Sequence, residues 1–175
     1  MRLQQVSKLS LFLIVVIFYS CDKGIEPLPS NDLRTGFGGR ITFIGQWPDS
    51  VTRTHLVVFK DPLISVSDFN VFNLRFVSQE IPFGSSEYIY SSRDSSVIPG
   101  TGEFQAGEYS YVAVAQSSKE DVSLDRADWY VVGLYFNEGD STKPGILTIP
   151  ENTYVDNINI ICDFDSPPPQ PPGGN

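Results

Sequence analysis

Short runs of β-branched and aromatic residues, each closed by a cluster of turn-forming residues, recur along this 175-residue chain. Such runs are typical of β-strands, whereas a helix would need an apolar repeat of 3.6 residues sustained over several turns. No segment has that repeat. Residues 119–129 allow one helical turn, with Asp121 or Ser123 as its cap. The expected strands are residues 40–44, 55–59, 73–81, 88–90, 109–116, 129–136, 146–149 and 155–164.

This spacing predicts an all-β fold, a single antiparallel β-sandwich of about 7–8 strands. We assign residues 38–165 to the sandwich and leave the strand order within 61–104 open. Residues 21–37 contain glycine, proline and asparagine without an apolar period, which predicts a flexible tether. Residues 166–175 are rich in proline, which predicts a disordered tail.

The first twenty residues have the features of an export signal. Arg2 and Lys8 precede an apolar run from Leu9 to Tyr19. A bilayer-spanning helix needs about 20 apolar residues, so this run is too short to span. Its length fits the apolar region of a signal peptide, about 7–15 residues. Cys21 follows directly after Ser20.

The arrangement resembles a bacterial lipoprotein signal, in which a loose lipobox precedes a lipidated cysteine. The resemblance implies that residues 1–20 form a cleavable signal helix and that Cys21 carries acyl chains on the mature protein. It also implies a lipid anchor in the cell envelope, and we favour the outer membrane, on its periplasmic or surface face. The alternatives are a buried first helix, or a simple signal peptide followed by an incidental cysteine.

The charge of the chain excludes several partners. Twelve basic and 21 acidic residues give a net charge of −9, and the leader contains no acidic residue. Affinity for nucleic acid depends on neutralising phosphates with lysine and arginine, so nucleic acid is an improbable partner. Electrostatic docking on anionic lipid is excluded by the same argument. The expected partners are the membrane, through the lipid anchor, and an envelope protein or a glycan.

Three short segments resemble prealbumin-like domains, the group that includes carboxypeptidase regulatory-like modules. They are the opening segment Gly38–Phe43, the segment Gln105–Val112, and the closing segment Val155–Ile160. The resemblance implies a seven- or eight-stranded sandwich that serves as a structural or binding module. It implies no catalytic residue.

The residues that could carry chemistry do not form a recognised motif. His55 is the only histidine, and a solvent-facing strand position is the favoured interpretation; a hydrolase that uses it or paired acids is the less favoured one. Cys162 alternates with isoleucine, which predicts a buried core residue. We expect no cofactor and no zinc. Calcium stays a hypothesis for two acidic loops, which contain Glu120, Asp121, Asp125 and Asp128, and Glu138 and Asp140.

Aromatic residues offer the one candidate binding surface. Tyr109 and Tyr111 would share one face of a strand whose other face carries Val112 and Val114. With the valines in the core, the tyrosines could stack on a ligand, or pack on neighbouring strands, which we favour. The expected function is a non-enzymatic binding or structural module; the alternative is a glycan-binding accessory lipoprotein of a polysaccharide-uptake system.

Overall fold

The structure of the chain is a computed structural model, which describes residues 34–94, 96–97 and 103–174. The leader, with the lipidation candidate Cys21, lies outside the described residues. Within those ranges, no helix combines the length and the apolar character that a membrane span requires. The only helices assigned there are two 3-10 turns, η1 (Val66–Asp68) and η2 (Arg126–Asp128), so the prediction of an all-β fold is confirmed.

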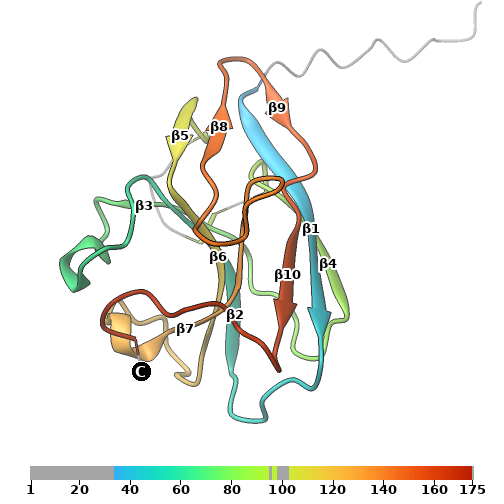
Figure 1. Cartoon of the computed structure of the whole chain (residues 1–175), viewed down its shortest axis with the longest axis vertical. Coiled ribbons are helices and arrows are strands. Elements are labelled where there is room, and N and C mark those ends of the chain that lie inside the picture. Colours follow the sequence, from blue (N-terminus) through green and yellow to red (C-terminus); the bar gives the residue numbers. More distant parts are fainter. Residues whose placement is uncertain (1–33, 95, 98–102, 175) are drawn as a thin grey trace, which may run out of the picture. The chain divides into compact units, whose positions relative to one another are not determined.

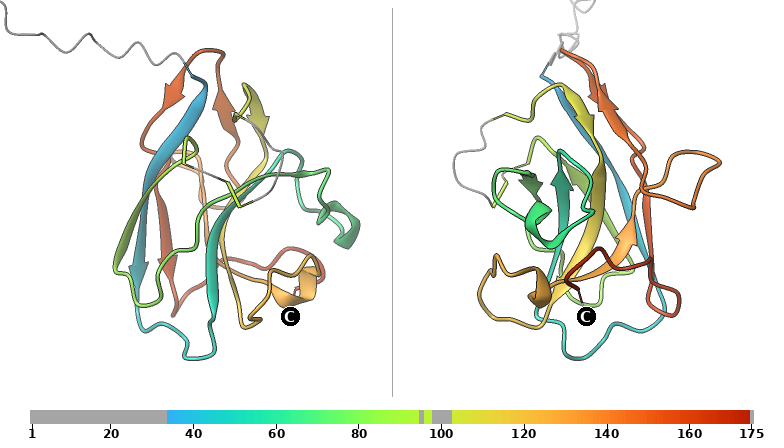
Figure 2. Two further views of the ribbon diagram at one scale, coloured as in Figure 1. Left: turned by 180° about the vertical axis from the view of Figure 1, so that it is seen from behind. Right: turned by 60° about the vertical axis from the view of Figure 1, so that its left-hand side comes forward.

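The described part of the chain contains ten strands, and all eight predicted runs contribute to them. The strands are β1 (Gly36–Ile44), β2 (Arg53–Phe59), β3 (Leu74–Val77), β4 (Glu87–Ser91), β5 (Gly107–Tyr109), β6 (Tyr111–Ser117), β7 (Tyr130–Leu134), β8 (Leu147–Ile149), β9 (Tyr154–Val155) and β10 (Ile160–Asp163). The main sheet has the order β3-β2-β6-β7-β10-β1-β4, with β9 beside β1, and it curls round an apolar interior (Figures 1 and 2). β5 and β8 form a separate two-stranded sheet.

The sheet is mixed, so the prediction of a purely antiparallel arrangement is wrong. β1 runs parallel to β10, with Ile41 opposite Ile160, and also parallel to β9. Alternation of apolar and polar residues determines which face of a strand is buried, but it carries no information on strand direction. The direction comes from the long connections between these strands.

The domain begins earlier than the predicted boundary at residue 38. β1 starts at Gly36, and Phe37, assigned from sequence to the tether, is fully buried. Its ring makes edge contacts with Phe76, Tyr90 and Phe104 at centroid distances of 5.9, 5.9 and 4.9 Å. A single aromatic residue between glycines gives no strand pattern, which is why the sequence placed it outside.

The proline-rich tail also differs from its prediction, because residues 166–174 pack on the domain. The Gln170 side chain forms two hydrogen bonds with the backbone of Val131, accepting from its N–H and donating to its carbonyl, each at 2.8 Å. The Arg126 guanidinium donates to the carbonyls of Trp129 and Pro171, the latter at 3.1 Å. The Gln170 side-chain amide thus pairs with the backbone of β7 at Val131, where no neighbouring strand does. The proline-rich composition of the tail gives no indication of this contact.

Candidate functional site

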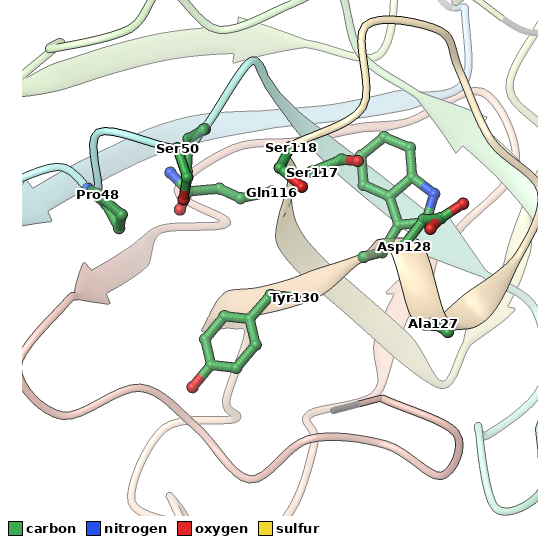
Figure 3. A pocket seen from close by; sticks show the side chains of 10 residues that line it. Pro48, Ser50, Gln116, Ser117, Ser118, Ala127, Asp128 and Tyr130 are labelled. Carbon is green, nitrogen blue, oxygen red and sulfur yellow. The ribbon is translucent and has the colours of Figure 1, made fainter.

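A hollow of about 300 Å³ lies at the end of β6 and the start of β7 and is a candidate site (Figure 3). Its walls come from the turn that precedes β2, from the loop that follows β6, and from η2. We call it the Gln116 hollow. It is lined by Pro48, Ser50, Val51, Gln116, Ser117, Ser118, Ala127, Asp128, Trp129 and Tyr130.

Gln116 is the unusual member of this lining. In the register of β6 with β2, Val112, Val114 and Gln116 alternate along one strand and therefore share its core face. Gln116 is only 3% exposed, and its Nε2 has no hydrogen-bond partner among the described residues. A buried donor left unpaired costs about 1–3 kcal/mol. Such a group is rare in a folded domain and calls for a physical explanation.

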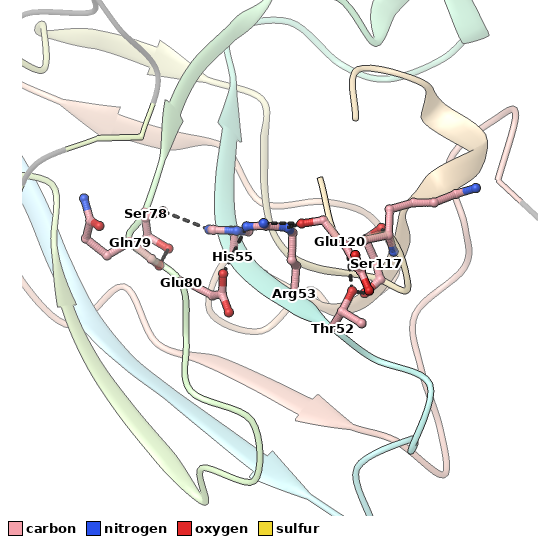
Figure 4. A network of polar contacts seen from close by, with 9 residues as sticks. Thr52, Arg53, His55, Ser78, Gln79, Glu80, Ser117 and Glu120 are labelled. Carbon is pink, nitrogen blue, oxygen red and sulfur yellow. Dashed lines mark hydrogen bonds and ion pairs between the residues drawn. The ribbon is translucent and has the colours of Figure 1, made fainter. Parts of the chain in front are cut away.

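Side chains at and just before the start of β2 hold the loop after β6 by donating to its main-chain carbonyls (Figure 4). The Thr52 hydroxyl donates to the carbonyls of Ser117 and Lys119 at 3.1 and 2.7 Å. Arg53 donates through Nε to the Glu120 carbonyl at 2.7 Å and pairs with Glu80 at 3.1 Å. These bonds hold the Ser117–Ser118 side of the hollow in place without using the Ser118 side chain.

The opposite wall is built on η2. Asp125 caps this turn by accepting from the Ala127 N–H at 3.0 Å, so the predicted helical turn is confirmed but its cap is neither Asp121 nor Ser123. The Ser123 hydroxyl donates to Asp128 at 2.6 Å, and the Ser123 carbonyl accepts from the Trp129 indole at 2.8 Å. The Asp128 carboxylate and the Trp129 ring are therefore held by the same serine.

The chemistry of the hollow is polar, with one aromatic surface and one charge. Asp128 is the only charged residue in the lining, and Lys119 lies 3.6 Å from it. Trp129 is nearly buried, whereas Tyr130 is 42% exposed and presents most of the accessible aromatic surface. Hydroxyl, amide and carboxylate groups beside an exposed ring can bind a small polar molecule.

His55 lies behind this site and is buried, so the prediction of a solvent-facing histidine is wrong. It is 2% exposed, its Nδ1 donates to the Ser78 carbonyl at 3.0 Å, and its ring is 6.1 Å from that of Trp129. Its Nε2 has no hydrogen-bond partner in the described part of the chain. Burial lowers the pKa of His55 below its usual value of 6.5. Neither ring nitrogen bonds a serine hydroxyl or a carboxylate, as a hydrolytic triad requires.

Tyr109 and Tyr111 do not form an exposed row. The strand breaks at Ser110, whose N–H donates to the Lys60 carbonyl, so the two rings enter different apolar clusters. Tyr109 is 3% and Tyr111 5% exposed, and burial raises the pKa of Tyr111 to about 12. The favoured interpretation, packing on neighbouring residues, agrees with this burial, and these rings offer no ligand platform. Val112 and Val114 lie in the core as predicted.

The remaining candidates are placed as follows. Cys162 is fully buried, as predicted, and burial raises the pKa of its thiol. Among the described residues, no three histidine, cysteine or acidic side chains come together as a metal site would need, and this includes both acidic loops. Asp140 instead accepts from Thr142 at 2.6 Å.

A second, wider hollow of about 610 Å³ lies over β1 and β4, and it differs in having its tyrosine hydroxyls paired. The Tyr90 hydroxyl donates to the Ile158 carbonyl at 2.5 Å, and the Tyr154 hydroxyl donates to Ser91 at 2.9 Å. Neither hydroxyl needs a ligand for its hydrogen bond, so this hollow is the weaker candidate.

Comparison with protein-family models, with curated proteins and with solved structures finds no match to this chain. The site therefore has to be interpreted from its own residues. The sequence did contain one signal for it: a glutamine follows Val112 and Val114 in the alternating row, at a position that should be apolar.

Proposed function

We propose that the chain is an exported lipoprotein whose β-domain is a non-enzymatic binding module held at the cell envelope by lipid on Cys21. The anchor is inferred from the leader sequence. In it, Arg2 and Lys8 precede an apolar run that is followed directly by Ser20 and Cys21. Two or more acyl chains give stable membrane attachment, whereas one gives only marginal attachment.

The observation that carries the binding role is the unpaired, buried Nε2 of Gln116 beside an open hollow. A ligand that supplies the missing acceptor recovers the cost of the unpaired donor, so the site is better satisfied when occupied. The non-enzymatic character is supported by the isolation of His55, the one histidine, behind the Trp129 ring. Neither feature depends on Tyr109 or Tyr111.

We further infer that the two halves of the curled sheet act as the layers of a β-sandwich of the prealbumin-like kind. In support, β7 and β10 are joined by a single residue pair, Gly133 opposite Cys162, so the sheet nearly divides there. Side chains from both halves, such as Ile41 and Val114, belong to one apolar cluster.

The anchor is tested by fractionating cells that express the full chain. Cys21→Ser should move the protein from the membrane to the soluble fraction, and the matched variant Cys162→Ser should leave it in the membrane. Mass spectrometry of the membrane form should find acyl chains on Cys21. A Cys21→Ser protein that stays in the membrane fraction would contradict the proposal.

The binding role is tested separately, by NMR on the full chain in detergent. A library of small polar compounds of several chemical classes should contain members that shift the Gln116 side-chain amide and the Tyr130 backbone amide saturably. If compounds of every class leave these signals unchanged, the domain is not a binding module of this kind.

A further inference from the structure

We propose that the Gln116 hollow binds a single neutral sugar ring, for example the terminal hexose of a glycan. This inference rests on the proposed function of the domain as a binding module and names its ligand class. It uses residues other than the tyrosines that first suggested a glycan.

The charge of the hollow favours a neutral ligand. Asp128 is the only charged residue of the lining, and no lysine, arginine or histidine belongs to the lining. An anionic ligand would therefore meet a carboxylate, and the one cation beside that carboxylate, Lys119, is already paired with it at 3.6 Å, in a chain of net charge −9. A cationic ligand would compete with Lys119, which already lies 3.6 Å from Asp128.

The hydrogen-bonding groups match hydroxyls, which donate and accept at once. The Gln116 amide supplies a donor whose Nε2 is enclosed and unpaired, and a ligand oxygen would be reached by rotation about the last side-chain torsion, which is broad. Asp128 supplies an acceptor on the other side. Ser50 and Ser118 are exposed residues of the lining, and the hydroxyl of each can donate or accept. Neighbouring hydroxyls of one ring can satisfy such a mixture.

The size and the aromatic surface indicate one ring. Ligand sites generally measure about 300–1,000 Å³, so a hollow of about 300 Å³ fits a small ligand. Tyr130 is 42% exposed, and its ring offers the apolar surface that the C–H face of a sugar can cover. Pro48, an exposed residue of the lining, adds a second apolar surface.

The test is an NMR titration of the full chain in a detergent that has no sugar headgroup. The probes are neutral hexoses and their methyl glycosides, with the corresponding hexuronic acids as charged counterparts. At least one neutral sugar should shift the Gln116 side-chain amide saturably, and its hexuronic acid should bind at least tenfold more weakly. Equal or tighter binding of the acid would overturn the inference.

Two variants link binding to the hollow. Gln116→Met keeps the length of the side chain and removes the unpaired amide, so affinity should fall about tenfold or more while the thermal unfolding midpoint stays or rises. Tyr130→Ala alters an exposed side chain and should also lower affinity about tenfold. The control Gln105→Met, at an exposed position outside the lining, should leave affinity unchanged. Binding that survives Gln116→Met and Tyr130→Ala would contradict the proposed site.

The failure of this inference is distinguishable from the failure of the proposed function. If nucleosides, amino acids or dipeptides shift the Gln116 amide and neutral sugars do not, the ligand class is wrong and the binding role stands. If no probe of any class shifts it, both are wrong.

Discussion

The two faces of β6 are both buried, but they are covered in different ways. Val112 and Val114 on one face pack in a large apolar cluster formed mainly by other strands. The opposite face lies under irregular segments, where the Arg126 guanidinium of η2 lies 5.9 Å from the centre of the Phe69 ring and donates to Pro171 of the C-terminal tail. We call these the strand-covered face and the loop-covered face.

The difference lies in what holds each cover in place. Apolar burial suffices for the strand-covered face, because its strands already pair their backbone groups. The loop-covered face depends on side chains that bind main-chain groups. Among the described residues it leaves Nε2 of His55 and Nε of Arg126 buried and unpaired, whereas the strand-covered face of β6 leaves only Nε2 of Gln116, at its end. The loop-covered face should therefore open at a lower free energy than the strand-covered one.

The largest expected effect is on the strand-covered face. Phe37→Ala removes a fully buried ring with three aromatic neighbours and should lower the free energy of unfolding by about 3–5 kcal/mol. Chemical denaturation measures this change. Phe72→Ala, at an 84% exposed position, is the control and should change it by less than about 0.5 kcal/mol. A small effect of Phe37→Ala would place residue 37 in the tether after all.

An intermediate effect is expected where the tail covers β7. Gln170→Ala removes both side-chain bonds to Val131 and should cost about 1–3 kcal/mol, since a buried backbone pair is left without partners. Hydrogen exchange of the Val131 amide should rise more than that of Val114. Gln105→Ala, at an exposed glutamine, is the matched control. Unchanged exchange at Val131 would show that the tail does not cover this face.

The smallest effect concerns acidification of the loop-covered face. Because burial lowers the pKa of His55 below 6.5, the unfolded chain takes up a proton at a higher pH than the folded one. Stability from this group is therefore complete above about pH 6.5 and declines as the pH falls below it, by at most about 1.4 kcal/mol per pH unit.

Unfolding curves between pH 7.5 and 5.5 measure this decline. The variant His55→Gln, whose amide can still donate to the Ser78 carbonyl, should be less sensitive to pH over this range. An equal decline in the variant would assign the effect to other groups.

Comparison of the two faces also shows what the sequence could predict. Burial on the strand-covered face could be predicted from the alternation of apolar and polar residues, as at Val112, Val114 and Cys162. A period of two determines which side chains point inward. The relative direction of two strands cannot be predicted from alternation, because the parallel pairing of β1 with β10 has no local signature in the sequence. His55 was assigned to solvent because alternation alone does not reveal that irregular segments bury the second side.

The candidate site was harder to predict for a related reason. Its residues come from three segments that meet only in the folded chain, and Trp129 contributes to it only because Ser123 holds the η2 loop. Gln116 was visible as a polar residue in an apolar row, but its lack of a partner depends on the side chains around it. Tyr109 and Tyr111 were misleading because the break at Ser110 separates residues that a continuous strand would keep on one face.

The parallel pairing of β1 with β10 has a consequence for the order in which the domain assembles. Ile41 finds its neighbour Ile160 only after nearly the whole domain has been synthesised. Contacts between such distant residues require a long loop to close before any energy is gained, which slows folding. A ribosome-bound fragment that lacks residues 160–163 would thus keep one side of β1 open, and completion of the sheet has to await the last strand.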